Sequence, residues 1–445
     1  MSFVMSMRFG WICPGSLATL RLLMLDYFIR RFLLIPPTLL GISFVVFLIT
    51  RAAPGGPIEQ AMMQMQQMSE EGSSGGQAET GLLDEEQKKD LERYYGLDKP
   101  VVQSYFIWLG FLHREKSHRE MEFEPGQTKA SARVRLVEGE AKKKRMRLER
   151  DTSENVVITN VGDFEGNWSW RKLEPKPNDK PGALRVEVFR RDYSGLIQGD
   201  LGRSFRYGKP VEQVIWSRLP VSTYFGFMTM LIIYAVCLPL GYFKAIKHNT
   251  WFDNSTSVLI FMGYAIPGYV LGFLLILLFA VKLGWFPSGG FTSINFDDLS
   301  AAEKVKDVLH HSVLPLGAYL VGGFAFVTML MKNHLMDNLA ADYMRTALSK
   351  GVAYRDAVRR HALRNSLIPI ATNLGHQVML FVTGSFLIEK IFDINGFGLL
   401  GFNAIIDRDF PVVMGVLMLS AFLMLLGNII SDVLMAMVDP RVRFD

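Results

Sequence analysis

The residue types that carry out chemistry occur in this chain, but their spacing does not build a catalytic centre. Gly208-Lys209 is followed by Pro210 and lacks the upstream glycine spacing of a phosphate-binding loop. The neighbours His310 and His311 come nearest to a metal-ligand cluster, and a solvated pair in a loop is the simpler interpretation. No Ser-His-Asp arrangement can be argued. The sequence therefore predicts that the chain is not an enzyme, has no metal site and binds no cofactor itself.

Ionisable residues inside long apolar runs are costly in a membrane and are functional suspects for that reason. Glu389 and Lys390 lie near the end of one such run, where they either form a charge pair at a gate or mark the membrane interface. Asp432 lies in the last run, and we expect it to pair with a backbone group or a basic side chain. The paucity of such acids argues against an ion-coupled carrier, and no filter-like element indicates a channel.

Small and polar residues inside the apolar runs form a second candidate set. They either line a translocation pathway or gate, or make contacts between helices, since glycine allows two helices to approach closely. The set consists of Gly263, Pro267, Gly322, Gly323, His376, Gln377, Ser385 and Glu389.

The polar stretch 337–369 lies between two apolar runs of membrane-spanning length. Its first half predicts a helix, because apolar or aromatic residues recur every four positions at Leu335, Leu339, Tyr343 and Ala347. Gly351 follows as a helix stop. A second helical pattern follows. It places Tyr354, Val358 and Ala362 inward, and it places Arg355, Arg359 and Arg360 outward. The stretch therefore predicts a helix-Gly-helix hairpin exposed to water, suited to a groove on a soluble partner.

The composition indicates a membrane protein with a sizeable polar part. The chain has 445 residues, of which 49% are hydrophobic, and its mean hydropathy is +0.19, too high for an ordinary soluble protein and too low for an entirely membrane-embedded one. The net charge is +5. Its two cysteines, Cys13 and Cys237, cannot form a disulfide framework.

Six apolar runs are predicted to span the membrane, at 28–50, 221–243, 257–281, 313–331, 370–392 and 412–438. We expect residues 1–23 to be an extension or a mis-called start, 24–50 to hold the first span, and 51–215 to form an outer polar region. Residues 213–219 suit a separate interfacial helix. Five spans and the loop 337–369 then form a core over 216–438, followed by a tail at 439–445. Lys and Arg in the short loops orient both termini toward the cytoplasm.

The outer region predicts a small β-rich subdomain within a charged insertion at about 113–192. Short alternating stretches at 132–137, 155–161 and 183–189 are typical of strands. The basic run 142–147 could suggest nucleic-acid binding, but acidic residues are interleaved with it, so a solvated surface is favoured and no nucleic-acid partner is expected. Contact with a soluble binding protein or with membrane lipid stays open.

The order of residues in the polar stretch resembles the coupling loop of ABC-importer permeases, in the form found in the dipeptide/oligopeptide family. The matching residues are Arg345, Thr346, Ala347, Gly351, His361, Arg364, Asn365 and Pro369. The resemblance runs from about Met24 to the C-terminus, interrupted by the insertion. Segments 263–267, 322–325, 384–389, 396–401 and 407–411 are similar to the Yej/microcin C branch of that family.

This resemblance implies an all-α polytopic protein with six transmembrane helices in the type I importer, MetI-like permease fold. It implies a multi-pass permease subunit in the bacterial inner membrane, which imports peptides or peptide-like compounds by alternating access. The implied partners are a second homologous permease subunit, a periplasmic peptide-binding protein and a cytoplasmic ABC ATPase, which binds the ATP and magnesium. Leu339, Tyr343, Arg345 and Ala347 would dock on the ATPase. The alternatives are an ABC permease for nickel or an oligosaccharide, and a non-ABC membrane scaffold that displays the outer domain.

Overall fold

The computed structural model describes residues 14–52, 99–125, 127–135, 143–150, 156–159, 167–173, 184–382 and 384–438. The chain forms two compact units, one of residues 1–54 together with 203–445 and one of residues 55–202. We describe each unit by itself.

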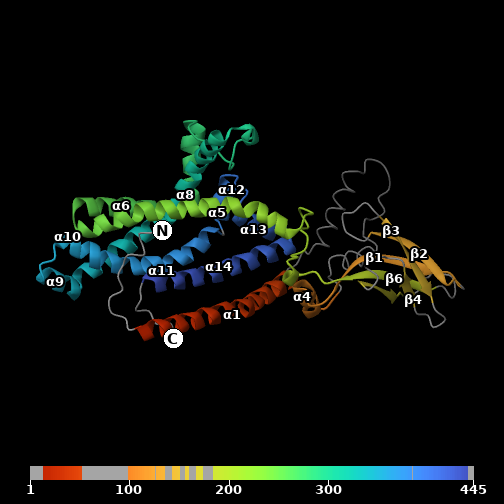
Figure 1. Cartoon of the computed structure of the whole chain (residues 1–445). Coiled ribbons are helices and arrows are strands. Elements are labelled where there is room, and N and C mark those ends of the chain that lie inside the picture. Colours follow the sequence, from red (N-terminus) through yellow and green to blue (C-terminus); the bar gives the residue numbers. More distant parts are fainter. Residues whose placement is uncertain are drawn as a thin grey trace. The chain divides into compact units, whose positions relative to one another are not determined.

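The first unit is helical (Figure 1). Its elements in chain order are α1 (Pro14–Ala52), α5 (Val211–Ile246), α6 (Trp251–Tyr264), α7 (Gly268–Leu275), the π-helical η3 (Ile276–Lys282), the short η4 (Phe296–Asp298), α8 (Ala301–Ala340), α9 (Asp342–Ser349), α10 (Tyr354–Ala357), the π-helical η5 (Val358–Ala362), α11 (Leu363–Val382), α12 (Phe386–Ile391), α13 (Phe397–Ile406) and α14 (Phe410–Val438).

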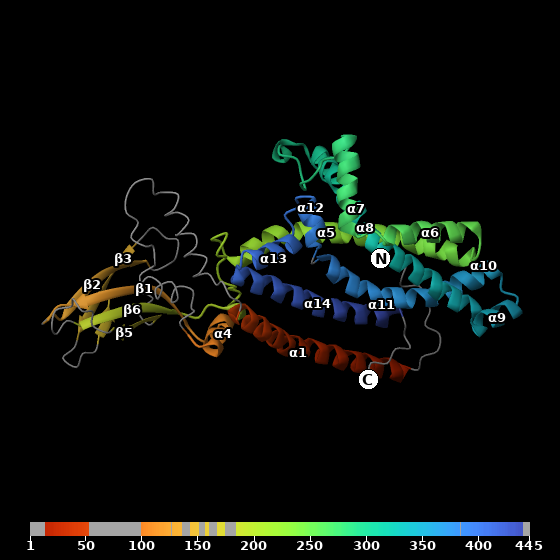
Figure 2. The same ribbon diagram turned by 180° about the vertical axis from the view of Figure 1, so that it is seen from behind.

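Four helices among the described residues are long and apolar enough to cross a membrane. They are Tyr27–Ala52 within α1, then α5, α8, and Phe410–Met437 within α14. A fifth candidate is the pair formed by α6 and the continuous segment Gly268–Lys282, which is bent by 90°. The bend falls just before Pro267, whose ring cannot continue the preceding helix. The expected third span at 257–281 is therefore a broken helix, and α7 points steeply away from the bundle in Figure 2.

Two further boundaries differ from the sequence expectation. The separate interfacial helix expected at 213–219 is the beginning of α5, which continues through Pro220 and Pro239 as one helix of 36 residues. The fifth run, expected to be one span to residue 392, instead ends its helix at Val382. Gly384 has a φ of +71°, a left-handed conformation that stops a helix, so α12 begins as a new element at Phe386.

The long helices pack along one another, as both views show (Figures 1 and 2). The most extensive contacts join α5 to α8 and α11 to α14, whereas α1 packs mainly on α14. Buried side chains of α5, α8 and α12 with the turn that follows form one core, centred on Phe225, Leu314, Ile388 and Phe392. Only 6% of the apolar window of α1 is buried, so most of its side chains face outward.

The second unit contains a short helix and two antiparallel sheets. The helix is α4 (Val101–Leu109), and η2 (Leu196–Gln198) follows the last strand. One sheet has the order β1-β6-β5 and the other β2-β3-β4. The strands are β1 (Arg114–Phe123), β2 (Lys129–Arg135), β3 (Lys143–Arg150), β4 (Val156–Thr159), β5 (Trp168–Lys172) and β6 (Leu184–Asp192).

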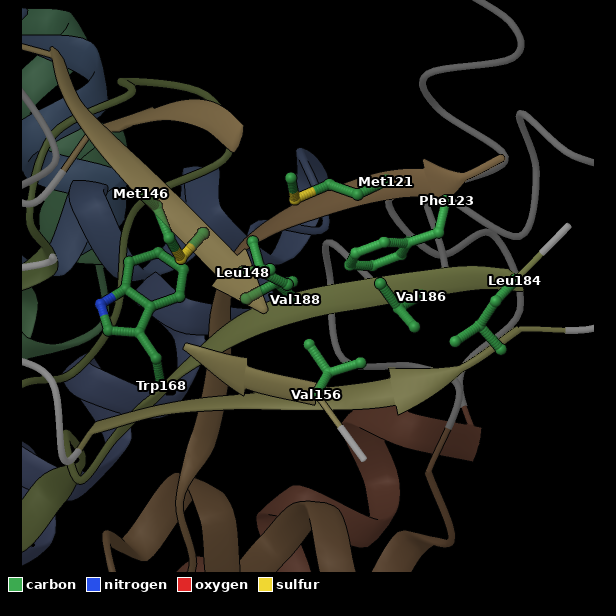
Figure 3. Packing of buried hydrophobic residues seen from close by; sticks show 9 residues of the cluster. All are labelled: Met121, Phe123, Met146, Leu148, Val156, Trp168, Leu184, Val186 and Val188. Atoms are coloured by element: carbon green, nitrogen blue, oxygen red, sulfur yellow. The ribbon is translucent and has the colours of Figure 1, made fainter. Parts of the chain in front are cut away.

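The two sheets share a single apolar core (Figure 3). Strand alternation places Met121 and Phe123 of β1, Met146 and Leu148 of β3 and Val186 of β6 on the inside, while the residues between them are charged. Phe123, Met146, Leu148 and Val186 are fully buried. The predicted β-rich subdomain is therefore confirmed, and the basic run at 142–147 belongs largely to β3 (Lys143–Arg150).

Candidate functional site

The polar stretch folds as two short helical segments joined by a left-handed glycine. The long helix α8 ends at Ala340, and Ala341 is extended (φ −70°, ψ 149°), so that α9 begins at Asp342 in a new direction. Gly351 has a φ of +82°, as the predicted helix stop requires, and its N–H donates to the carbonyl of Leu348 at 2.9 Å. The chain then re-enters helix at Tyr354 and continues through η5 into α11.

The inward face of this segment is apolar and well packed. Met344 and Ala347 of α9, together with Ala357, Val358 and Ala362, join a core with Ala245 of α5 and Leu335 of α8. Ser366 strengthens this junction, because its hydroxyl donates to the carbonyl of Ala362 at 2.7 Å and lies 3.2 Å from that of His334. The segment is therefore fixed to the ends of α5, α8 and α11 rather than free in solution.

Both tyrosines of the segment face outward, although the helical pattern placed Tyr354 inward with Val358 and Ala362. Tyr343 and Tyr354 are exposed, whereas Met344 is only 2% exposed. The four-residue spacing from Leu335 to Ala347 assumed one continuous helix. Because the backbone is extended at Ala341, α9 is a separate helix, and the spacing does not carry over from α8 to α9. The second helical pattern was correct for Val358 and Ala362, which are buried, and for the exposed arginines at 355, 359 and 360, whereas Ala347, expected to dock on the ATPase, is buried.

The other predicted coupling residues lie on or beside the same exposed surface. Arg345 is 80% exposed at its side chain and lies 3.7 Å from Asp342, and the Thr346 hydroxyl donates to the Asp342 carbonyl at 3.0 Å. His361, Arg364 and Asn365 are also exposed. Leu339 is partly buried against the core described above. Pro369 lies inside α11, where its carbonyl accepts a bond from Asn373 at 2.9 Å.

A buried charge cluster at the same end of the bundle was missed by sequence reasoning. Lys244 of α5 is 0% exposed, and its ammonium lies 3.0 Å from Asp253 Oδ1. It also donates to the Asp253 carbonyl at 2.7 Å and to the hydroxyls of Thr256 and Ser257 at 2.8 Å each. Lys332 of α8 approaches both carboxylate oxygens of Asp253 at 2.8 Å.

This cluster ties three helices together through one carboxylate. Asp253 stands in the first turn of α6, and its partners come from α5 and α8. The backbone N–H of Asn249, in the turn between α5 and α6, donates to Asp253 Oδ2 at 3.2 Å. The sequence offered one signal, an acidic residue at the start of a helix after a basic turn, but not the distant Lys332.

Glu389 is fully buried and joins α12, α13 and α5. The Ser222 hydroxyl donates to its Oε1 at 2.8 Å, and the Leu399 N–H donates to its Oε2 at 2.6 Å. Ser222 also accepts from the Phe397 N–H at 2.7 Å. Of the two interpretations left open for Glu389 and Lys390, the charge pair is not formed, since among the described residues Glu389 makes no ion pair. Its carboxylate instead accepts from the N-terminus of α13.

The Glu389 carboxylate occupies space that side chains at Gly384 and Gly396 would otherwise fill. A Cβ on Gly384 would lie 2.2 Å from Glu389 Oε1, and one on Gly396 would lie 2.4 Å from its Cδ. No side chain fits at either position without displacing Glu389. Ser385, which precedes α12, is held by its backbone N–H, which donates to the Tyr319 hydroxyl at 3.2 Å. Ser385 and Glu389 therefore belong to one packed junction between α12 and its neighbours.

The remaining pathway candidates differ in their surroundings. A Cβ on Gly323 would lie 2.4 Å from the Ile233 side chain, so this glycine permits α8 to approach α5 closely. For Gly263 and Gly322, no described atom lies within 4 Å of the Cβ position, and close packing does not explain them. Pro267 marks the bend before α7. His376 and Gln377 lie on α11, but their side chains are outside the described set.

Asp432 of α14 meets a basic partner, as expected. The Arg31 guanidinium of α1 lies 3.3 Å from its Oδ2, and the Tyr27 hydroxyl donates to the same oxygen at 3.0 Å. The contact joins the start of the candidate span Tyr27–Ala52 to the last third of α14. Within the described part of the chain, no group of three or more His, Cys, Asp or Glu side chains could hold a metal ion.

These elements define a multi-pass helical membrane protein with an exposed helical segment at one end. Residues 237–444 match the family described as the inner membrane component of binding-protein-dependent transport systems. The chain is 31% identical to the peptidoglycan transport system permease protein YejB of Agrobacterium fabrum, over 94% of this chain and 98% of that protein. It is 32% identical to the inner membrane ABC transporter permease protein YejB of Escherichia coli O157:H7, over 94% and 99% respectively.

The chain therefore belongs to the family of inner-membrane permease subunits of binding-protein-dependent ABC transporters. A shorter match of 250 residues is 34% identical to the oligopeptide transport system permease protein AppB of Bacillus subtilis, over 56% of this chain and 78% of that protein. Among solved structures, the inward-facing MetNI methionine ABC transporter aligns with 51% of this chain and 97% of its own chain, at 16% identity and a TM-score of 0.40.

Membership of the family indicates which steps of transport belong to this subunit and which belong to its partners. The permease subunit forms part of the membrane pathway and does not hydrolyse ATP, which is the task of a separate subunit. No cofactor is expected in a permease subunit of this kind. A binding protein that delivers the solute is the second partner that the family implies.

Proposed function

We propose that this permease imports peptides or peptide-containing compounds, and that it does so by alternating access. The support for the substrate class comes from the relatives, whose names refer to peptidoglycan and oligopeptide transport. Peptidoglycan fragments contain peptides, so the two names describe one chemical class. The support for the mechanism is the exposed segment 342–365, which is fixed by its apolar face to three long helices of the membrane unit.

The surface of α9 and the following turn is the ATPase docking site in this proposal. It presents two aromatic side chains, Tyr343 and Tyr354, beside the charged Arg345 and the apolar Leu348, all of them exposed. Aromatic and arginine side chains are enriched at protein interfaces because they combine large contact area with polar tips. Motion of the docked ATPase would reach α5, α8 and α11 through Met344 and Ala347, which anchor the segment.

The proposed arrangement has six spans and both termini on the cytoplasmic side. The five candidate spans are joined by α11, whose 20 residues equal the length of about 20 that crosses the hydrocarbon core. The contact of Arg31, near the start of the span Tyr27–Ala52, with Asp432, near the end of α14, supports having both termini on one side. The Lys and Arg residues of 244–250 and 332–364 favour the cytoplasm for the end that carries α9.

A second permease subunit would complete the pathway. The helix α7 extends away from the bundle (Figure 2), whereas α6 packs beside α8, and the pair exposes large apolar side chains such as Leu259, Phe261 and Phe273. In this proposal the partner is a different, homologous subunit. Gly263, Pro267 and Gly322, which the packing of this chain leaves open, would then face the shared pathway, with Glu389 and its glycines as a rigid boundary.

The deciding experiment is ATPase activity of the reconstituted transporter with and without its binding protein loaded with peptide. We expect stimulation by peptide-loaded binding protein, and none by binding protein alone. If a nickel complex or an oligosaccharide stimulates the ATPase activity and peptides do not, the substrate belongs to another class of solute. No stimulation by any solute, with a correctly assembled complex, would contradict the importer function itself.

A further inference from the structure

An apolar surface is exposed on the second unit, around α4. The exposed residues of this helix are Val102, Gln103 and Phe106, and only the glutamine is polar. Phe111 follows the helix and lies with its ring edge-on to Phe106, at 6.3 Å between centroids. The other face of α4 is buried and includes Tyr105, Ile107 and Trp108. The helix is thus apolar on nearly all sides, which a helix on a water-facing surface is not.

The segment after β6 extends this apolar surface. The Gln198 side chain donates to the Gly110 carbonyl at 3.3 Å, which places η2 beside the end of α4. Tyr193 and Ile197 on this segment are 60% and 59% exposed. We call the set Val102, Phe106, Phe111, Leu112, Tyr193 and Ile197 the α4 patch. Contiguous exposed apolar residues of this kind mark a binding surface rather than ordinary protein surface.

The close approach between the two segments is built into the backbone. A Cβ on Gly195 would lie 2.4 Å from the Gly110 backbone nitrogen, so only glycine allows the segments to touch there. Gly110 itself ends α4 in the left-handed conformation, with a φ of +93°. The patch is therefore a fixed surface held by backbone geometry, and not a chance exposure of mobile side chains.

A basic side chain borders the patch. Arg191 is exposed two residues before Tyr193, whose ring lies 6.0 Å from that of His113. Lys99, just before α4, is paired with Glu115 at 2.9 Å. Aromatic rings beside basic groups are the composition of surfaces that lie in the headgroup region of a bilayer. Such a border attracts anionic lipid headgroups.

The chain itself keeps this surface near a membrane. Val211, the first residue of the membrane-spanning helix α5, follows Ile197 by 14 positions, a length that reaches about 50 Å when fully extended. We propose that the α4 patch is an interfacial anchor that lies in the headgroup region of the bilayer. Its occupant is the phospholipid surface, attracted by apolar and aromatic side chains and by the basic border.

Spin labels can measure whether the α4 patch lies in the headgroup region. The assembled transporter is placed in lipid nanodiscs of phosphatidylethanolamine and phosphatidylglycerol. Cys13→Ser and Cys237→Ala remove the native thiols, and single cysteines are placed by Phe106→Cys or Ile197→Cys. The accessibility of each label to oxygen, which enters lipid, is compared with its accessibility to a polar nickel complex, which does not. The matched control is Val157→Cys, since Val157 is an apolar residue of β4 with 55% exposure outside the patch.

We expect the labels at positions 106 and 197 to be more accessible to oxygen than to the nickel complex. The label at position 157 should be more accessible to the nickel complex. Adding Phe106→Glu and Phe111→Glu to the Ile197→Cys chain should shift its label toward the nickel complex. Nickel-dominated labels at all three positions would overturn the proposal. So would labels at 106 and 197 shielded from both reagents, because a protein surface would then cover the patch, whether from the binding protein, the second permease subunit or another part of this chain.

Discussion

Gly351 offers the sharpest test of how the exposed segment transmits motion. Its φ of +82° lies in the left-handed region, which side chains with a Cβ rarely adopt. No atom of the described residues lies within 4 Å of a Cβ built there, so a larger side chain would meet open space. The effect of a substitution should therefore come from backbone conformation alone, and should follow each residue's tolerance of positive φ rather than its size.

The expected magnitude follows from this conformational cost. A residue with a Cβ costs about 1–2 kcal/mol in the left-handed region, and asparagine costs less because it visits that region more readily. Since about 1.4 kcal/mol changes a population tenfold, Gly351→Ala should reduce the correctly folded turn by roughly tenfold in relative population. Gly351→Val should cost more. Gly351→Pro cannot adopt the conformation and also removes the N–H that binds Leu348.

The assay is solute uptake and solute-stimulated ATPase activity in proteoliposomes, with membrane insertion checked by the amount of purified complex. We expect the order Asn, Ala, Val, Pro from least to most impaired, with insertion unchanged. The matched control is Gly41→Val, since Gly41 lies in helical α1 and no described atom is within 4 Å of its Cβ position. If the asparagine, valine and proline variants all show wild-type uptake and wild-type solute-stimulated ATPase activity, the reasoning is refuted.

Three further predictions concern the buried charges. Asp253→Ala leaves two lysines without their shared carboxylate, and thermal unfolding of the purified subunit should show a loss of about 3–5 kcal/mol, whereas Asp253→Asn should lose less. Glu389→Ala leaves two buried hydrogen-bond donors unsatisfied, at about 1–3 kcal/mol each, and Glu389→Gln should restore part of the melting temperature because it keeps an acceptor. The hydrogen bond from His118, aided by Arg171, holds the pKa of Glu187 at about 2 against an ordinary 4.5, although burial raises it. That carboxylate stabilises the second unit above pH about 4.5, and its contribution of at most about 3 kcal/mol is lost as the pH falls toward 2. Protease resistance of the second unit between pH 5 and 3 should therefore fall in the wild type and depend less on pH in Glu187→Gln.

Local patterns in the sequence were sufficient for the features that depend on neighbouring residues. The left-handed glycine at 351 and the outward arginines that follow it were predicted because helix periodicity and helix stops are local. Of the six strands in the described part of the chain, three were recognised from apolar alternation, at β2, β4 and β6, and β1, β3 and β5 were missed. Charged residues dominate the sequences of β1 and β3, where only every second side chain reaches the core.

Features that depend on distant residues could not be predicted. One hydrogen-bond partner of Glu389 is Ser222, 167 residues earlier, which no local pattern indicates, so the sequence offered only the neighbouring Lys390 as a possible partner. The orientation of Tyr343 depended on a break at Ala341 that no proline or glycine marks. The bend before α7 was signalled by Pro267, but proline also occurs inside the continuous helix α5, so its presence alone does not decide between a kink and a break.

The position of Asp253 bears on how the protein enters the membrane during synthesis. Lys244 lies nine residues before it, so the end of α5 and the start of α6 carry a pair of opposite charges as soon as both helices have left the ribosome. Lys332 is made 79 residues later and can join only after α8 is inserted. The helical hairpin can thus form early with its carboxylate already neutralised, and the later lysine then fastens α8 to it, which gives assembly a preferred order.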